Sequence, residues 1–395
     1  MIEIPDIQIS DYGYDLPASR IAMYPLPERD ASKLLVYRNG QIFDRIFNQL
    51  DELLPDNALL IFNDTKVIHA RIQSLYNNHV IEIFCLEPID PWNSALNFEQ
   101  REHCVWKCFV GNNRRWKAGL LTIETTHETV RITRQKPIDN AWLVHFQWNS
   151  GRSFAEILET IGKMPLPPYI HRDADADDEV RYQTIFAEQS GSVAAPTASL
   201  HFTETMLQKL CDKHIETHKL TLHVGAGTFK PVTTPSISDH LMHSERVMIG
   251  QPVIHSIINA IESGRSIIPV GTTSLRSIES LFWLDIASDL SKKNYCVEQW
   301  TPYTNETAYA QRDVVKHLKM LALQESITFQ TSLLIAPTYC FHIANGIITN
   351  FHQPCSTLLL LIAALIGDSW KSVYSHALAQ DYRFLSYGDS CLFLP

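Results

Sequence analysis

The chain has 395 residues, of which 45% are hydrophobic and 19% are charged, and its formal net charge at pH 7 is −10 with the 17 histidines taken as neutral. A chain of this length and composition is expected to fold, with room for more than one domain, and intrinsic disorder is excluded. The acidic balance argues against broad, nonspecific binding of nucleic acid but leaves room for a local basic groove.

The eight cysteines include no Cys-x-x-Cys pair, and the N-terminal residues are acidic and polar. These features indicate reduced thiols, no signal peptide and a cytoplasmic protein. The longest apolar run, residues 358–366, has nine residues, whereas a membrane span needs about 20. We therefore expect no membrane segment.

The first buried strand is expected at residues 59–62, where LLIF runs without a polar residue and ends at Asn-Asp-Thr. Such a run is typical of a strand covered on both faces. From residue 67 to residue 148 the pattern changes to six short runs, several of them alternating apolar and polar residues, with turns between them. Six short strands within about 80 residues favour a small closed barrel or a sandwich.

Beyond residue 150 strands alternate with helices. A helix is expected after Thr203, and strands are expected at residues 220–224, 267–270 and 346–349. Each strand runs into a polar or glycine-rich corner, and in α/β sheets the ligand crevice lies outside such strand ends. We predict an α/β fold in which a mixed α/β domain is interrupted by an inserted small all-β barrel. The α/β domain would comprise residues 1–66 and 151–395, and the barrel residues 67–150.

The corner after the strand at residues 267–270 reads Gly-Thr-Thr-Ser and precedes a helix. Unpaired amides at a helix N-terminus attract a carboxylate or a phosphate, and the hydroxyls of Thr272 and Thr273 add donors. An ordinary capped turn explains the same residues, because neither a P-loop lysine nor a full set of dinucleotide-binding glycines is present.

Three other corners contain reactive side chains or small residues. Residues 350–354 place an amide, an aromatic ring and His352 at a strand end, where the histidine is either poised in a crevice or satisfied in the core. Residues 194–198, Ala-Ala-Pro-Thr-Ala, are small enough to let the backbone approach a ligand, and His201 follows them. The Gly-Ala-Gly turn at residues 225–227 is either a weak nucleotide-binding signal or a tight turn.

Two polar clusters have competing interpretations. His240, His243 and Glu245 could hold a metal ion, but their spacing differs from His-Glu-x-x-His, and polar or packing histidines explain them better. Residues 113–117, Asn-Arg-Arg-Trp-Lys, are either a patch that binds phosphates and stacks a base or a solvated loop.

The order of the motifs along the chain is more specific than any one of them. The informative stretches are Tyr14–Pro17, Ile21–Ala22, Arg29–Ser32, Phe62–Ile68, Pro165–Ile170, Arg181–Thr184, Ala194–Ala198, Leu200–Phe202, Leu222–Gly225, Gly227–Phe229, His240, Met242–His243, Glu245, Val270–Thr273, Thr349–His352, Ser356–Leu358, Tyr382–Phe384 and Ser386–Asp389. In these stretches the chain resembles the S-adenosylmethionine:tRNA ribosyltransferase-isomerases of queuosine biosynthesis. The resemblance spans nearly the whole chain and is thin inside the β insertion.

The resemblance implies an α/β domain with an inserted β-barrel, and an enzyme that transfers the ribosyl part of S-adenosylmethionine instead of its methyl group. The acceptor would be the aminomethyl group of 7-aminomethyl-7-deazaguanine at the wobble position of tRNA, with epoxyqueuosine-tRNA, adenine and methionine as products. The sulfonium acidifies the neighbouring C5′ protons, and an imidazole with a pKa near neutrality suits their removal. No metal and no redox cofactor is required. We expect the enzyme to be a monomer, with S-adenosylmethionine and this tRNA as its partners.

Applied to this chain, the resemblance suggests that several histidines converge at the strand ends and that one of them is the base. These histidines are His201, His223, His243 and His352. Thr272 and Thr273 are expected to hold the methionine carboxylate. Further substrate contacts are expected from Pro196, Thr197 and Asn350, and phosphate contacts from Arg172, Arg181 and Arg383.

The chain departs from the family's pattern at several positions. Ser199 and Thr338 stand where the family usually has glycine, and Cys355 stands where it usually has lysine. Two rival functions stay open at this point. One is a paralogue that binds tRNA without this activity, and the other is a metal-dependent hydrolase built on His240, His243 and Glu245.

Overall fold

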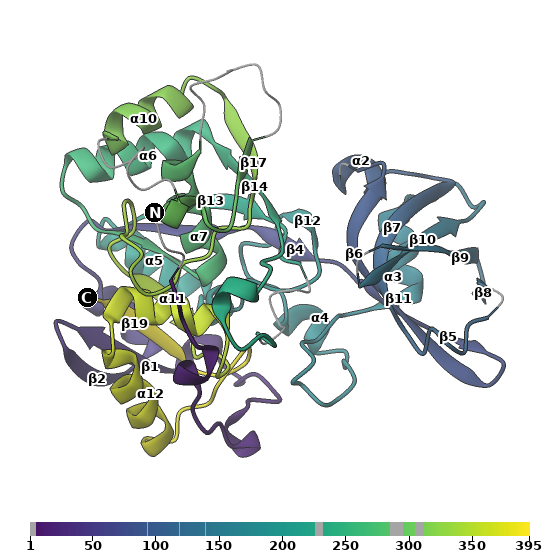
Figure 1. The fold of residues 1–395 in the computed structure, drawn as a ribbon, viewed down its shortest axis with the longest axis horizontal. Helices are drawn as coiled ribbons and strands as arrows, with labels where there is room; N and C mark the ends of the chain where they lie inside the picture. Colours follow the sequence, from purple (N-terminus) through teal and green to yellow (C-terminus); the bar gives the residue numbers. More distant parts are fainter. Residues whose placement is uncertain are drawn as a thin grey trace.

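The computed structural model describes residues 5–92, 94–117, 119–138, 140–225, 232–284, 295–304 and 312–395. The chain forms a mixed α/β body from which a mostly β region projects (Figure 1).

A six-stranded sheet forms the centre of the α/β body. In spatial order its strands are β15 (Ile267–Pro269), β3 (Leu59–Asn63), β13 (Glu216–Leu222), β14 (Glu245–Gly250), β17 (Ser326–Thr331) and β16 (Tyr295–Val297). β3 pairs in parallel with β13 and β15, whereas β14 is antiparallel to both of its neighbours. Every residue of β3 is buried, which confirms the strand predicted from its apolar run.

The two faces of β3 contribute to different cores. The helices involved are α5 (Glu204–Asp212), α6 (Gln251–Glu262), α7 (Thr272–Trp283) and α10 (Val314–Leu321). Leu59 and Ile61 share a core with α6, α7 and α10, whereas Leu60 and Phe62 share a core with α5. Alternate residues of a strand project to opposite faces, so this central strand needs apolar residues at every position.

The start of α5 follows the predicted cap. The Thr203 hydroxyl accepts a hydrogen bond from the Met206 amide at 3.1 Å, as expected of an N-cap threonine. Met206 and Leu210 are buried, whereas Cys211 is exposed.

A second sheet lies beside the first and contains the predicted strand at residues 346–349. In spatial order its strands are β18 (Ile347–Asn350), β19 (Ser390–Leu394), β1 (Lys33–Arg38) and β2 (Gln41–Ile46). A single parallel bridge between Val270 and Ile348 connects the ends of β15 and β18. Two strand ends from different sheets therefore lie side by side. The helices α11 (Thr357–Ile366) and α12 (Ser369–Ala379) follow β18.

The projecting region contains a curled antiparallel sheet. In spatial order its strands are β11 (Gly162–Lys163), β5 (Arg71–Tyr76), β6 (His79–Asp90), β7 (His103–Gly111), β10 (Ala141–Gln147), β9 (Thr129–Ile138) and β8 (Leu120–Glu124). Five of the six predicted runs coincide with β6 to β10, whereas the first, residues 67–72, extends from the end of β4 to the start of β5 and has no strand at residues 68–70. β5 also contacts β8, but the hydrogen-bonded order of the described residues runs from β11 to β8 without closing. The barrel therefore stays a prediction.

The packing of this region bears on its boundary and on the basic loop. The buried face of α3 (Phe154–Ile161) shares a core with Trp106 and Phe146 of the sheet, so the packed unit continues past residue 150 to Lys163. The division into residues 67–150 and the rest remains a prediction. Trp116 is fully buried, with the Arg134 guanidinium 5.5 Å from its ring centroid, so it is excluded as a base-stacking surface.

The remaining elements are short connections. They are α1 (Leu50–Leu53), β4 (Thr65–Val67), α2 (Ser94–Phe98), α4 (Asp178–Arg181), β12 (Gln189–Ser192), α8 (Thr301–Thr304) and the 3-10 helices η1 (Ile9–Tyr12), η2 (Ala18–Arg20), η3 (Arg29–Ala31), η4 (Phe47–Gln49), η5 (Thr197–His201) and η7 (Ile237–Asp239). Within the described ranges no single helix has the length and apolar character to cross a membrane. The pair α11 and α12 passes the test of length and apolar composition when taken together, but the two helices are bent by 114°.

Candidate functional site

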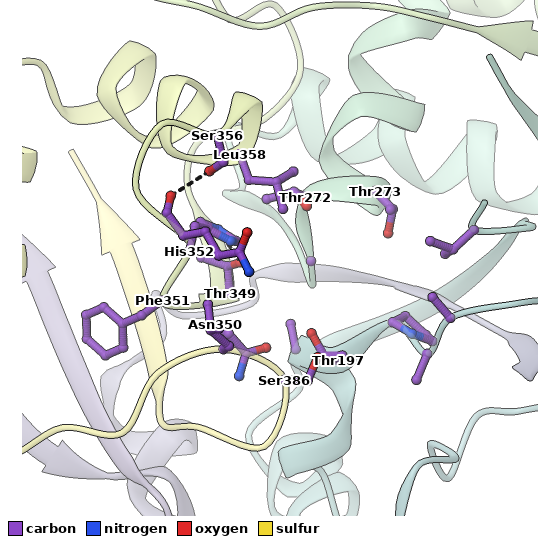
Figure 2. Close-up of a pocket in the computed structure, with 18 of the residues that line it drawn as sticks. Thr197, Thr272, Thr273, Thr349, Asn350, Phe351, His352, Ser356, Leu358 and Ser386 are labelled. Carbon is purple, nitrogen blue, oxygen red and sulfur yellow. Dashed lines mark hydrogen bonds between the residues drawn. The ribbon is translucent and has the colours of Figure 1, made fainter. Parts of the chain in front are cut away.

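A pocket lies where β15 and β18 end, beside the start of α7 (Figure 2). We call it the main pocket. It is lined by Tyr169, Ala194–Ala198, Val224, Gly271–Thr273, Thr349–Gln353, Ser356–Leu358, Leu385 and Ser386. The pocket thus sits at the corners that the sequence analysis singled out, outside the ends of neighbouring strands.

The small residues at 194–198 form one wall of the main pocket. Ala194, Ala195 and Ala198 are buried, and η5 begins at Thr197. Because these side chains are short, the backbone itself approaches the space of the pocket. Pro196 and Thr197 therefore lie where the sequence analysis expected substrate contacts.

The N-terminus of α7 forms a second wall. Gly271 precedes the helix with φ 91°, a conformation that a residue with a side chain rarely adopts. Thr272 and Thr273 follow it and both line the pocket, and Figure 2 shows them entering from the α7 side, across from His352. Free amides and hydroxyls at this helix start suit a bound anion.

His352 lies in the connection between β18 and α11, and its backbone is held by two tyrosines. Its amide donates to the Tyr374 hydroxyl at 3.2 Å, and its carbonyl accepts from the Tyr14 hydroxyl. Its Nε2 lies 3.2 Å from Thr349 Oγ1. Burial lowers the pKa of His352 to about 3, so the imidazole is uncharged at neutral pH. This differs from the expectation of a pKa near neutrality, because removing water from around the ring disfavours its charged form.

His201 reaches the same region through Asn350. The Asn350 Nδ2 lies 3.0 Å from His201 Nε2, and the Nδ1 of the same ring lies 2.8 Å from Ser32 Oγ. Burial, with smaller contributions from neighbouring arginines, lowers the pKa of His201 to about 4. The Oδ1 of Asn350 is buried and has no hydrogen-bond partner among the described residues. Asn350 lines the main pocket, so this unpaired acceptor belongs to a residue of the pocket wall.

A second, smaller pocket adjoins the main one, and Ser386 lines both. We call it the arginine pocket. It is lined by Pro25, Leu26, Arg29, Ser32, Arg181, Leu200, His201, Arg383 and Ser386–Gly388. Two of the three arginines proposed for phosphate contacts, Arg181 and Arg383, therefore lie together. The third, Arg172, forms a two-point ion pair with Asp178 at 2.6 and 2.8 Å and lines neither pocket.

The other two candidate histidines lie outside the walls of both pockets. His223 packs its ring against Gly191, where an added Cβ would come within 2.7 Å of the imidazole, and its Nδ1 lies 3.0 Å from Thr65 Oγ1. Burial lowers the pKa of His223 to about 4. The described residues thus place His352 in the main pocket and His201 in the adjoining arginine pocket, where it contacts Asn350 of the main-pocket wall, but they do not bring all four histidines into one pocket.

His243 takes part in a charged cluster. Its Nε2 lies 3.2 Å from Glu245, which also forms an ion pair with the buried Arg276. Across the described part of the chain no group of three or more His, Cys, Asp or Glu side chains is placed to hold a metal ion. The Glu245 carboxylate is paired with the Arg276 guanidinium. This pairing disfavours a metal-dependent hydrolase built on His240, His243 and Glu245. Of the Gly-Ala-Gly turn, only Gly225 lies within the described residues.

The three departures from the family pattern lie outside the lining of the main pocket. Cys355 has φ 54°, and its sulfur would lie 3.7 Å from a Cβ added at Gly13. Thr338 has φ 84°. Ser199 is fully buried, and its Oγ has no hydrogen-bond partner among the described residues.

Several lining residues received no role from the sequence. Tyr169, Thr349, Ser356 and Ser386 line the main pocket and Arg29 lines the arginine pocket. All of them fall within the stretches that carry the family resemblance, which was the available signal. Their roles were missed because a stretch of matching residues does not say which side chains point into a cavity.

The main pocket suits a small organic ligand that carries an anionic group. It combines small residues, a helix start rich in hydroxyls, an unpaired amide oxygen and an uncharged imidazole.

The family described as queuosine biosynthesis protein matches residues 9–393. A protein of Treponema denticola named S-adenosylmethionine:tRNA ribosyltransferase-isomerase is 34% identical over 97% of this chain and 99% of its own length. A protein of the same name from Aromatoleum aromaticum is 37% identical over 97% of this chain and 96% of its own. The chain belongs to this family of queuosine biosynthesis proteins.

A crystal structure of an S-adenosylmethionine tRNA ribosyltransferase from Thermotoga maritima matches 98% of this chain and 100% of that chain, with 23% identity and a TM-score of 0.48.

Proposed function

We propose that the chain is an S-adenosylmethionine:tRNA ribosyltransferase-isomerase. It transfers and isomerises the ribosyl moiety of S-adenosylmethionine onto 7-aminomethyl-7-deazaguanine at the wobble position of tRNA, and releases adenine and methionine. The observation that carries this proposal is the match over 97% of the chain to relatives of that name. The geometry of the main pocket supports it in three respects.

The first respect is the anion site. Thr272 and Thr273 line the pocket at the N-terminus of a 12-residue helix, and such an end stabilises a negative charge by roughly 0.3–1 kcal/mol at an exposed site. In this proposal it holds the carboxylate of the methionine part. The small residues from Ala194 to Ala198 then allow a flat base to lie against the backbone, with Pro196 and Thr197 in contact with it.

The second respect is the base. In this proposal the uncharged His352 takes a proton from C5′ of S-adenosylmethionine, and the electron pair of the C–H bond stays on the carbon next to the sulfonium. A neutral imidazole suits this position because a protonated one would repel the sulfonium. Burial lowers the pKa of His352 to about 3, so the imidazole is uncharged at neutral pH and has a free lone pair for the proton. Overall, the acceptor nitrogen gives up a proton as it bonds to the ribosyl carbon, the bond to adenine breaks and adenine leaves with a proton, and methionine leaves with the electrons of the C5′–S bond.

The third respect is the amide. The unpaired Oδ1 of Asn350 suits an N–H donor on adenine or on the deazaguanine. His201 holds the other end of this amide from the arginine pocket side. In this proposal the substrate contacts both His352 and Asn350, which lie together at the end of β18.

The finer arrangement of the molecule belongs to the same proposal. Residues 67–150 form a small barrel inserted into an α/β catalytic domain of residues 1–66 and 151–395. The enzyme works as a monomer in the cytoplasm, away from membranes, without a cofactor beyond its S-adenosylmethionine substrate. Light scattering on the purified protein tests the oligomeric state.

The test of the activity is adenine release. Purified protein is mixed with S-adenosylmethionine and tRNA bearing 7-aminomethyl-7-deazaguanine, with unmodified tRNA as the control. Adenine that appears only with the modified tRNA, together with a mass gain of that tRNA, supports the proposal. A folded protein that binds the modified tRNA but releases no adenine contradicts it and favours the inactive paralogue. Activity that requires added zinc would favour the metal-dependent alternative.

A further inference from the structure

We infer that the arginine pocket binds a phosphodiester of the tRNA next to the wobble nucleotide. This inference rests on the proposed function and assigns a substrate contact within it. Its starting point is the charge of the pocket walls. Arg29, Arg181 and Arg383 all line this small space, and it is joined to the main pocket at Ser386.

The positive charge of this pocket is poorly compensated. Arg383 lies 3.6 Å from the buried Asp389, but no carboxylate among the described residues forms an ion pair with Arg29 or Arg181. Both side chains instead donate to backbone carbonyls: Arg29 to those of Gln183 and Leu200 at 2.9 and 3.2 Å, and Arg181 to that of Pro27 at 2.8 Å. Carbonyls fix the guanidinium groups in place without neutralising them. An anion of matching size would therefore be attracted to the pocket.

Arg181 also has an unused donor. Its Nε is buried and has no hydrogen-bond partner among the described residues. A buried N–H that lacks a partner costs free energy, and an incoming oxygen atom removes that cost. Arg29 and Arg181 are also close enough for the charge of Arg181, after burial, to lower the pKa of Arg29. Bringing an anion between them relieves this repulsion.

The surroundings favour a phosphodiester over the methionine carboxylate as the anion. The helix start at Thr272 and Thr273 lines the main pocket and not this one. Next to the arginine pocket, Tyr24 is 57% exposed, with the Arg172 guanidinium 4.1 Å from its ring centroid. The Tyr24 carbonyl accepts from Arg383 at 3.4 Å, which ties this ring to the pocket rim. An exposed ring beside a set of arginines is how proteins stack a base and hold its phosphate.

The test measures binding of an anticodon stem-loop with 7-aminomethyl-7-deazaguanine at the wobble position, without turnover, at several salt concentrations. Arg181→Gln should weaken binding roughly tenfold, as expected for a lost charged hydrogen bond. It should also reduce the slope of log K against log salt by about 0.7, the value for one contact to a single strand. Arg181→Lys should retain most of the slope. Arg45→Gln, an exposed arginine on β2, is the matched control and should leave both quantities unchanged.

The RNA provides an independent arm that does not depend on how the variants fold. Replacing each phosphate that flanks the wobble nucleotide by an uncharged methylphosphonate should weaken binding to the wild-type protein at one position. At that position the loss should not add to the loss caused by Arg181→Gln, because both changes remove the same contact. Fully additive losses at every position would overturn the inference.

The competing source of the anion gives a different result. If the arginine pocket held the methionine carboxylate, Arg181→Gln would weaken binding of S-adenosylmethionine and leave the salt dependence of RNA binding unchanged, which would overturn the inference. Adenine release by the wild-type protein is recorded in parallel. Its absence would count against the proposed function, whereas normal release with an unchanged salt slope in Arg181→Gln would count only against the phosphate site.

Discussion

Asn350 Nδ2 lies 3.0 Å from Nε2 of His201, and this contact joins the wall of the main pocket to the wall of the arginine pocket. The amide donates, so the facing ring nitrogen accepts and the imidazole is held in its neutral form with Nδ1 toward Ser32. The orientation of the amide then turns its Oδ1 into a buried acceptor without a partner among the described residues. The contact between Asn350 and His201, which are 149 positions apart in the sequence, thus fixes the orientation of an acceptor, Asn350 Oδ1, that a ligand could use.

We expect Asn350→Ala to lower kcat/KM for adenine release by roughly 10- to 100-fold. The reason is that a substrate N–H would lose its partner while remaining buried, which costs about 1–3 kcal/mol. Steady-state kinetics with the modified tRNA checks the effect, and thermal unfolding shows whether the variant is folded. Ser32→Ala, which removes the other partner of His201 but keeps the amide, is the control and should cost less. An Asn350→Ala enzyme with wild-type kcat/KM would exclude the amide from substrate contact.

His352→Ala should lower kcat by about 10²–10⁴, the usual contribution of a general base. The dissociation constant for S-adenosylmethionine should change much less, because the carboxylate is expected to be held by the start of α7. Single-turnover kinetics and equilibrium binding separate the two quantities. Tyr14→Phe removes only the hydroxyl that donates to the His352 carbonyl and should have a smaller effect on kcat. Wild-type turnover by His352→Ala would remove this residue from the list of bases.

Stability should fall as the pH is lowered through the titration range of the buried histidines. The folded-state pKa of His201 and of His223 is lowered to about 4, and that of His352 to about 3. Below the ordinary pKa of 6.5 the unfolded chain therefore binds protons that the folded chain does not, and unfolding becomes more favourable. Stability is full above pH 6.5 and is lost progressively as the pH falls toward 4, by at most about 3 kcal/mol for a histidine shifted to 4.

Urea unfolding at pH 7.5, 6 and 5, values spaced roughly one unit apart across this range, measures that loss. His223→Asn should make the free energy of unfolding less dependent on pH, because one shifted group is removed. His79→Asn, at an exposed position on β6, should leave the dependence as it is. An equal pH dependence in the wild type and in His223→Asn would contradict the assignment of His223 as a buried neutral imidazole.

Thr338→Gly should stabilise the protein by about 1 kcal/mol. Thr338 has φ 84°, where a β-branched residue is strained by about 1–3 kcal/mol. Glycine relieves this strain, but its greater conformational freedom in the unfolded chain offsets part of the stabilisation. The comparison with Thr338→Ala separates two causes, because alanine removes the branch but keeps the Cβ. We expect glycine to have the higher urea midpoint of the two. A lower midpoint for glycine than for threonine would show that the turn is not strained.

The elements predicted best from the sequence are those whose signals are local. The continuous apolar run of β3, the alternating runs of the curled antiparallel sheet and the helix start at Thr203 each depend on a few neighbouring residues, and each is present in the structure. Residues of the corners at 194–198 and 350–354 line the main pocket. In these cases strand ends and small residues indicated where a crevice lies, but not which distant segments form its other walls.

The features that the sequence did not predict depend on contacts between distant segments. β18 belongs to a different sheet from β15, and the bridge between Val270 and Ile348 brings their ends together. The pairing of His201 with Asn350 and the place of Arg29 in the arginine pocket depend on this arrangement. The low pKa values likewise follow from burial, which the sequence does not display. A near-neutral base was therefore expected where the pocket holds an imidazole with a pKa of about 3.

Ser199→Ala should stabilise the protein, by up to about 1 kcal/mol. Ser199 is fully buried in η5, and its hydroxyl has no hydrogen-bond partner among the described residues. A buried hydroxyl without a partner costs free energy relative to water, whereas a methyl group in the same space does not. Alanine keeps the Cβ and the helical backbone, so the change isolates the hydroxyl. The urea midpoint should rise while the rate of adenine release stays within twofold, since Ser199 lies outside the lining of both pockets. A lower midpoint for Ser199→Ala would mean that the hydroxyl has a partner in solution, which a buried water molecule would supply.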